Sequence, residues 1–160
     1  MKYLAPTECP FYLITKSSLA VTAIMKKILA RNGLSEIKPA YLGVLMCLWT
    51  DEGIDEMLGK FGSIDGMRLI ELGRCAGLEP STMTGLIDRM ERDGLVHRSN
   101  DPHDRRAQQA TLTKKGIQVR TNVLAAMDEM FREAFTGIDP EKLETVKDVL
   151  RKILANANKG

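Results

Sequence analysis

Residues 80–94 of the chain are PSTMTGLIDRMERDG, and residues 95–116, LVHRSNDPHDRRAQQATLTKKG, follow directly. The first stretch is predicted to be a helix, because proline favours the first helical position and glycine the position after the last. Its apolar residues recur at helical spacing: Met83, Leu86, Ile87 and Met90. The second stretch has apolar and polar residues in alternation on both sides of a charged loop, which is typical of a β-hairpin. The two stretches together predict a helix followed by a two-stranded wing.

The polar side of the predicted helix has residue types that suit the major groove of DNA. Small hydroxyl residues and a glycine in its first half let the backbone come close to base edges, and the N–H groups at its start can hold a phosphate. Arginines further along can reach phosphates or guanines. Asp88 and Glu91 would repel DNA, so we expect them to face protein and to pair with arginines of the wing. The expected DNA-contacting residues of this helix are Ser81, Thr82, Thr84, Gly85, Arg89 and Arg92.

The loop at residues 101–106, DPHDRR, places two adjacent arginines at the predicted hairpin tip. Cations at such a tip suit a narrow, electronegative minor groove. We therefore expect His103, Arg105 and Arg106 to contact DNA. An amphipathic helix with a solvated polar side and a charged surface turn remain the plain alternatives.

The rest of the chain is predicted to be helical from apolar stripes and from residues that begin or end helices. A helix over Leu69–Cys75 and a tight turn at Gly77 would complete a helix-turn-helix. The glycine-rich segment 51–66 is expected to hold one brief amphipathic helix that covers the core or lines an effector pocket. The other helices are expected at Phe11–Arg31, from Pro39, from Thr113 to about Phe135, and after Asp139-Pro140.

This order of elements predicts a mainly α fold with a small β-hairpin wing (α+β). Residues 38–112 are expected to form a winged helix-turn-helix lobe that binds DNA. Residues 1–37 and 113–160 are expected to form a helical dimerisation region, because their apolar stripes need a second copy to cover them.

The segment Leu69–Gly116 resembles the MarR family of bacterial winged helix-turn-helix transcription regulators. The pattern D-x-R-x5-L-T-x-x-G is present, beginning with Asp104 and Arg106 and ending at Gly116. Residues 81–91 look like the recognition helix of that family. Outside this segment the likeness rests on helix order and length, and the connection 51–66 is longer than the family leads us to expect.

The resemblance implies a homodimer that binds a pseudo-palindromic operator in double-stranded DNA, often as a repressor released by a small ligand. It implies that Asp104 orients the wing by pairing with a nearby arginine, and that Arg106 enters the minor groove. Some family members sense oxidants through a cysteine near the first helix, where Cys9 lies. Cys9 is therefore a redox candidate, although no lysine, arginine or histidine lies within four residues of it.

The composition of the chain excludes only a few classes of protein. The 160 residues carry 23 Lys and Arg against 21 Asp and Glu, a net charge of +2, so any basic DNA-binding face must be local. No apolar stretch is long enough to span a membrane, and no secretory signal is recognised. Cys9, Cys47 and Cys75 show no C-x-x-C spacing, which favours a reduced cytoplasm; Cys47 and Cys75 are expected to be small buried hydrophobes.

Few signs of other chemistry are present. A small aromatic or amphipathic effector would suit Tyr12, Ser18, Tyr41, Leu45 and Trp49, although such residues more often form plain core. His97 and His103 cannot supply a zinc site, so we expect no metal and no cofactor. Enzyme motifs such as G-x-S-x-G, H-E-x-x-H and the P-loop are absent, which argues against an enzyme. A winged-helix protein-interaction module and an oxidant-sensing regulator acting through Cys9 are the alternatives.

Overall fold

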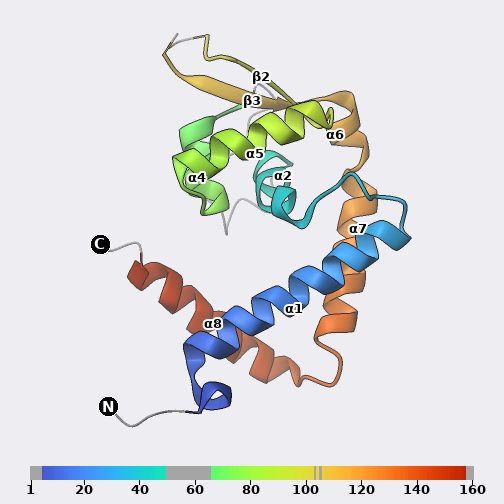
Figure 1. The fold of residues 1–160 in the computed structure, drawn as a ribbon, viewed down its shortest axis with the longest axis vertical. Coiled ribbons are helices and arrows are strands. Elements are labelled where there is room, and N and C mark those ends of the chain that lie inside the picture. The colour runs from blue at the N-terminus through green and yellow to red at the C-terminus, as the bar shows by residue number, and fades with distance from the viewer. Residues whose placement is uncertain (1–4, 50–65, 103, 105, 158–160) are drawn as a thin grey trace.

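The computed structural model of the chain describes residues 5–49, 66–102, 104 and 106–157. One end of the molecule is a lobe in which α2, α4 and α5 pack beneath a small sheet (Figure 1). The long helices α1 and α7 extend from this lobe, and α8 follows α7 at the end of the molecule away from it (Figure 1). The mainly α fold with a small sheet that the sequence predicts is confirmed.

The N-terminal part is a short 3-10 helix, η1 (Pro6–Glu8), followed by the long helix α1 (Pro10–Arg31). The helix ends at Asn32, whose side-chain amide donates to the Ile28 carbonyl at 3.0 Å. Gly33 then adopts a φ of 74°, a left-handed conformation that glycine takes without a steric cost. Only the last half of α1 has buried side chains: Met25, Ile28 and Leu29.

The second predicted helix is in two parts. Pro39 begins a 3-10 turn, η2 (Pro39–Tyr41), and the α-helix α2 follows over Leu42–Leu48. Trp49, directly after α2, is buried, and its Nε1 donates to the Gly116 carbonyl at 2.9 Å. This bond joins the centre of the lobe to the chain that leaves the wing. The brief helix predicted in segment 51–66 lies outside the described residues, apart from Gly66.

The helix-turn-helix consists of α4 (Leu69–Ala76) and α5 (Pro80–Arg92), close to the predicted bounds. Between them Gly77 has a φ of 66°, and the Leu78 N–H donates to the Gly73 carbonyl at 2.8 Å. This left-handed glycine with its back-bonded successor is a common way to end a helix. The α4 helix therefore stops abruptly, and the chain turns into α5.

The wing is formed by β2 (Val96–Asn100) and β3 (Gln108–Leu112), which pair antiparallel with Arg98 opposite Ala110. A third strand, β1 (Met67–Arg68), pairs with the other edge of β3, so the strand order is β1-β3-β2. Sequence analysis missed β1. A strand of two residues shows no alternation, and its partner lies about 40 residues further along the chain, beyond any local pattern.

After the wing, Thr113 caps the next helix as predicted, since its hydroxyl accepts from the Gly116 N–H at 3.0 Å. The single long helix predicted to about Phe135 is instead two helices, α6 (Lys114–Gln118) and α7 (Arg120–Ala134), which meet at Val119. Gly137, with a φ of 76°, separates α7 from α8 (Pro140–Ala157). Asp139 Oδ1 accepts from the Glu141 N–H at 2.8 Å, which is the predicted cap of that last helix.

One hydrophobic core runs through the lobe and into the ends of α1 and α7. Its members come from every element of the lobe, so the helices and the sheet are held together as one packed unit. Its largest fully buried side chains are Ile28, Leu29, Ile37, Leu45, Leu72, Met83, Leu86, Ile87, Met90, Leu95, Val44 and Val96.

Gly116, the last residue of the D-x-R-x5-L-T-x-x-G pattern, lies where two chain segments meet. A Cβ atom at this position would come within 2.1 Å of the Leu95 carbonyl oxygen. Because that neighbour is backbone, it cannot move aside as a side chain can. The glycine in this pattern is therefore required by the close approach of α6 to the start of the wing.

The structure corrects the prediction for two of the cysteines. Cys47 in α2 and Cys75 in α4 form a disulfide, with their Cα atoms 6.2 Å apart, whereas sequence analysis took both for unpaired buried thiols. Spacing along the chain gave no sign of the pair, because the two cysteines lie 28 residues apart on different helices. Cys9 is free. No helix within the described residues is both long and apolar enough to cross a membrane.

Candidate DNA-binding surface

The helix α5 is anchored in the lobe by its apolar side. Met83, Leu86, Ile87 and Met90 are each no more than 2% exposed. Their spacing places them on one side of the helix, as the sequence predicts. The opposite side consequently faces solvent along the whole length of α5.

Most of the residues predicted to contact DNA lie on that solvent-facing side. Exposed side chains are those of Ser81, Thr82, Thr84, Arg89 and Arg92. Gly85 is half-buried, and a Cβ placed on it would meet nothing within 4 Å. The glycine is therefore not required for packing within this chain; it leaves open space beside Thr82 and Thr84 where another molecule can approach the helix.

The two acidic residues of α5 are turned towards the wing. Asp88 Oδ1 lies 2.9 Å from a guanidinium nitrogen of Arg98 on β2. Glu91 Oε1 accepts from the Arg98 N–H at 2.8 Å and lies 3.5 Å from His97 Nδ1. The prediction that these carboxylates pair with the wing is confirmed, although the arginine involved is on a strand and not at the tip. Asp88 is paired with a cation and Glu91 is hydrogen-bonded to the wing backbone, so both acidic side chains of α5 are held on its wing side.

The base of the wing is held by an ion pair between Arg68 and Asp101 that was not predicted from the sequence. Arg68 Nε on β1 donates to Asp101 Oδ2 at 2.6 Å, and Asp101 is almost fully buried. The hydrogen bond with Asp101 raises the pKa of Arg68. Asp104 contributes differently: its Oδ1 accepts from the Arg106 N–H at 3.0 Å, and its own N–H donates to Asp101. Asp104 thus orders the loop backbone, while Asp101 makes the ion pair, since it lies at the strand end beside β1.

At the wing tip, Arg106 is exposed. Predicted contacts by His103 and Arg105 lie outside the described residues. A hollow of about 570 Å³ separates this part of the wing from the start of α4. Arg68 and Arg106 both line it, together with Leu69, Ile70, Asn100, Asp104, Ala107 and Gln108.

The far end of α5 is fixed by a partly buried hydrogen bond. The Tyr41 hydroxyl, from η2, donates to Asp93 Oδ2 at 2.7 Å. Burial of the phenol and this bond raise the pKa of Tyr41 to about 12. Lys115 Nζ adds a second bond, to the Asp93 carbonyl at 2.9 Å. The orientation of α5 is therefore set by η2 at its end and by the wing along its side.

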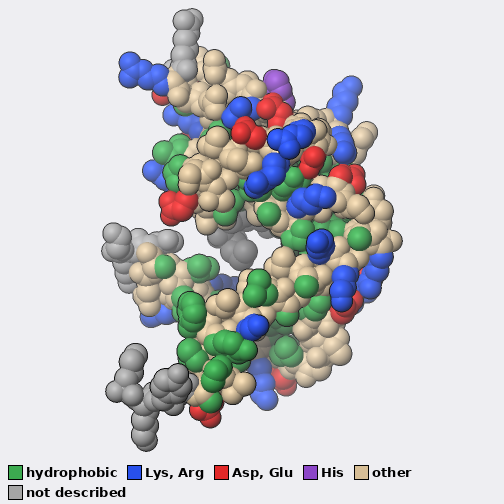
Figure 2. All heavy atoms as spheres, viewed as in Figure 1, with side chains coloured by type: hydrophobic (Ala, Val, Ile, Leu, Met, Phe, Trp, Pro, Cys, Tyr) green, Lys and Arg blue, Asp and Glu red, His purple; other side chains and the backbone are tan. Residues whose placement is uncertain are grey.

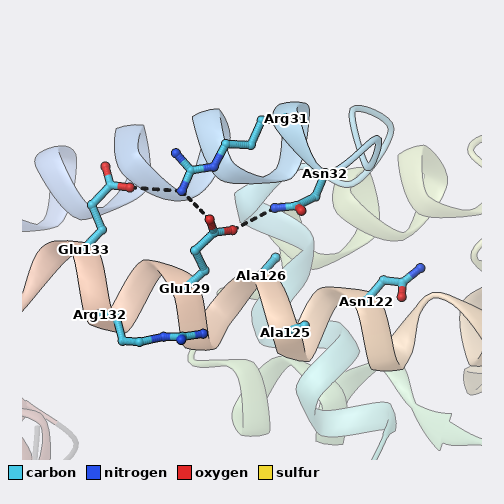
Figure 3. A pocket seen from close by; sticks show the side chains of 8 residues that line it. All are labelled: Arg31, Asn32, Asn122, Ala125, Ala126, Glu129, Arg132 and Glu133. Carbon is cyan, nitrogen blue, oxygen red and sulfur yellow. Dashed lines mark hydrogen bonds and ion pairs between the residues drawn. The ribbon is translucent and has the colours of Figure 1, made fainter.

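Beyond the lobe, polar side chains fasten α1 to α7 around a surface hollow (Figure 3). Arg31 lies between Glu129 and Glu133, at 2.5 and 3.2 Å, and Asn32 donates to Glu129 at 2.8 Å. These hydrogen bonds, from Asn32 first and from Arg31, lower the pKa of Glu129. Each of these charged side chains has a partner within the chain, so the contacts serve to align α1 with α7.

The five residues predicted to bind an effector are not on one surface. Tyr41, Leu45 and Trp49 are buried in the core, and the polar atoms of Tyr41 and Trp49 bond within the chain. Tyr12 and Ser18 are exposed on the first half of α1. Tyr41, Leu45 and Trp49 therefore fit the alternative interpretation, in which such residues form part of the core. Cys9 is half-buried, and no group of three metal-ligating side chains is found in the described part of the chain.

A second surface is apolar. Green side chains gather over the first part of α1 and over α8 (Figure 2), and α8 has no buried side chain. The exposed large apolar residues on these two helices are Phe11, Tyr12, Leu13, Ile14, Leu19, Val146, Val149, Leu150, Ile153 and Leu154. We call this set the apolar end face.

An α4–turn–α5 unit followed by a hairpin defines a winged helix-turn-helix protein. Residues 60–107 match the model of the MarR family. The homoprotocatechuate degradative operon repressor of Escherichia coli is 33% identical over 85 residues, which are 53% of this chain and 57% of that protein. Among solved structures, AbsC, a MarR family transcriptional regulator from Streptomyces coelicolor, is 25% identical with a TM-score of 0.77, and the match covers all of both chains.

The structure of Sco3205, a MarR family regulator from Streptomyces coelicolor in complex with DNA, shows the same fold, with a TM-score of 0.77 and 21% identity over 98% of this chain and 91% of that one. These findings confirm the resemblance predicted from the sequence: residues 60–107 are similar to the MarR family, and the fold is similar to that of solved MarR family regulators. The curated relative is matched over little more than half of its length.

Proposed function

We propose that this protein is a sequence-specific DNA-binding transcription regulator that acts as a homodimer on a pseudo-palindromic operator. The observation that carries the proposal is the charge arrangement on α5. Its hydroxyl residues and arginines face solvent, while Asp88 and Glu91 are held by Arg98 on the wing. A helix exposed in this way presents hydrogen-bonding groups and cations to base edges and phosphates, with its carboxylates held on the side of the wing.

We assign the major groove to Ser81, Thr82, Thr84, Gly85, Arg89 and Arg92, and the minor groove to the wing tip at His103, Arg105 and Arg106. The Arg68–Asp101 ion pair, in which the aspartate is buried, supports this division because it fixes the wing base against α4. The wing and α5 then present their contacts as one rigid surface.

We infer that residues 38–112 form the DNA-binding lobe and that residues 1–37 and 113–160 form the dimerisation region. The apolar end face supports this division, since burying one side chain of the size of valine, leucine or phenylalanine contributes about 1.5–3 kcal/mol. Several of these side chains are exposed in the single chain. A second copy that covers the end face would place two α5 helices on one side of a duplex, about one helical turn (roughly 34 Å) apart.

We propose repression as the mode of action, by extension from the relative in Escherichia coli that is named as an operon repressor. A repressor of this form competes with transcription by occupying its operator. A small aromatic or amphipathic effector would then release it, although the buried positions of Tyr41, Leu45 and Trp49 leave only Tyr12 and Ser18 of the predicted set accessible.

The proposal is tested by selecting duplexes from a randomised pool with the full chain and titrating the selected duplex at several salt concentrations. Arg106→Ala should weaken binding by about 1–3 kcal/mol and reduce the salt dependence by about one unit for each lobe, because one phosphate-directed cation is lost. Thr84→Ala should change which bases are selected and leave the salt dependence nearly unchanged.

Lys152→Ala provides the matched control, since this exposed lysine lies on α8, outside the lobe. It should leave both affinity and salt dependence as in the unaltered chain. If no duplex is enriched, the DNA-binding assignment is wrong, and the winged helix would be a protein-interaction module. If Arg106→Ala binds the selected duplex unchanged, the wing tip is not part of the DNA contact.

A further inference from the structure

The Cys47–Cys75 disulfide joins the core of the lobe to the helix that leads into α5. Cys47 lies in the last turn of α2, and Cys75 lies in the last turn of α4, two residues before Gly77. We propose that these cysteines form a reversible dithiol–disulfide couple whose state sets how firmly α4 and α5 are held on α2, and thereby the affinity for DNA. The effect on DNA rests on the proposed function; the effect on α4 and α5 does not.

Helix packing holds the two cysteines opposite each other. Near the disulfide, α2 and α4 approach closely: a Cβ placed on Gly43 would lie 3.7 Å from the Cβ of Ala76. Gly43 is one helical turn before Cys47, and Ala76 is the neighbour of Cys75. The Cα separation of 6.2 Å is within the range that a disulfide bridges. Because other contacts fix this crossing, the thiols stay adjacent after reduction, and the bond can form again.

The two sulfurs differ in solvent exposure, which decides which of them an external thiolate attacks first. Cys47 is 2% exposed, whereas Cys75 is half-buried. A low-molecular-weight thiolate therefore attacks the Cys75 sulfur, forms a mixed disulfide there and releases the Cys47 thiolate. A second thiolate attacks the external sulfur of that mixed disulfide, which releases the Cys75 thiolate and the external disulfide. Two external thiols are oxidised, the protein bond gains two electrons, and both cysteines take up protons. The reverse reaction with a low-molecular-weight disulfide restores the bond.

A change at Cys75 reaches α5 through a short, tight connection. The Leu78 N–H donates to the Gly73 carbonyl at 2.8 Å. A Cβ placed on Gly73 would lie only 3.1 Å from the Leu78 carbonyl oxygen. The last turn of α4 therefore moves together with the residue that precedes Glu79 and Pro80, where α5 starts. The residues proposed to contact DNA at that end of α5 are Ser81, Thr82 and Thr84.

The expected place of action favours a switch over a permanent crosslink. A protein that binds genomic DNA works in a compartment where small thiols keep most cysteines reduced, and disulfides found there are usually transient or redox-sensing. The third cysteine, Cys9, precedes α1 and is free. The pair can therefore be followed separately in a Cys9→Ser background.

The test equilibrates full-length Cys9→Ser protein in glutathione buffers of graded redox ratio. Three quantities are then measured: alkylated thiols by mass spectrometry, amide hydrogen exchange of α4 and α5, and affinity for the duplex selected above. Oxidation should slow exchange in both helices and tighten DNA binding about fivefold, the lower end of usual coupling between sites. Cys75→Ser in the same background should match the reduced form in every buffer, because it cannot form the bond.

Each outcome supports or contradicts the proposed redox couple. If the pair never reduces, or reduces without any change in exchange, the couple is not a switch. If exchange changes but DNA affinity does not, the link to DNA is wrong while the DNA-binding function stands. If neither redox form binds the selected duplex, the proposed function fails, and the exchange data alone still confirm or reject control of α4 and α5 by the couple.

Discussion

The winged-helix lobe and the apolar end face differ in whether the chain itself covers the apolar stripe of a helix. In α5 the apolar stripe is filled by the same chain, and its four members are each no more than 2% exposed. In α8 a stripe of the same spacing has no buried member, and Leu154 is 66% exposed. An apolar stripe in a sequence therefore shows that a helix needs a partner, but whether that partner is in the same chain depends on the fold.

The largest effect is expected from charge placed on the end face. Leu150→Glu with Ile153→Glu should raise the dissociation constant of the dimer at least about a thousandfold, because two apolar side chains per copy lose their cover. Sedimentation equilibrium measures the change. The control is Glu144→Ala, on the opposite side of α8, which should associate as the unaltered chain does. A double variant with unchanged association would show that α8 is not covered by a second copy.

A smaller loss is expected inside the lobe. Ile87 is fully buried, so Ile87→Ala should lower the free energy of unfolding by about 2–5 kcal/mol through the cavity that it leaves. Urea unfolding at one fixed protein concentration gives this value, since the stability of a dimer depends on concentration. Thr82→Ala, on the exposed side of the same helix, should change it by less than about 0.5 kcal/mol. Similar losses for the two variants would mean that α5 has no distinct buried side.

The smallest effect concerns the bond that fixes the end of α5. Tyr41→Phe should cost about 1 kcal/mol, because Asp93 loses its donor. The pKa of Tyr41 is raised from 10.0 to about 12 in the folded protein, so the stabilisation is complete below pH 10 and is lost as the pH rises towards 12.

Unfolding measured between pH 9 and about pH 11.5 should therefore show a steeper decline for the unaltered chain than for Tyr41→Phe. Tyr12→Phe is the control, since Tyr12 lies on the exposed half of α1. Parallel declines in all three proteins would remove Tyr41 from the pH dependence.

The sequence predicts well those features that depend on neighbouring residues. The cap at Thr113, the breaks at Gly77 and Gly137, and the buried side of α5 follow from spacing and from residues that begin or end helices. The pairing of Asp88 with the wing was also predictable, because like charge excludes a carboxylate from DNA. In each case the physical cause lies within a few residues of its effect.

Features that join distant segments were missed. The disulfide and β1 need the three-dimensional crossing of elements that no local pattern shows. The Arg68–Asp101 ion pair was not predicted, because Arg68 lies on β1, a strand that was not predicted either. The effector residues were chosen for composition, and composition does not separate Tyr41 and Trp49, which are core, from Tyr12, which is exposed.

In the strand order β1-β3-β2, β3 is the middle strand and is hydrogen-bonded to both of the others. The chain reaches α4 from β1 and leaves α5 into β2, so both ends of the helix-turn-helix are hydrogen-bonded to the same middle strand. A displacement of the wing is consequently transmitted to both ends of the helix-turn-helix, so the wing and α5 move together. The helices α6 and α7, which follow β3 and meet at Val119, lie outside this hydrogen-bonded unit.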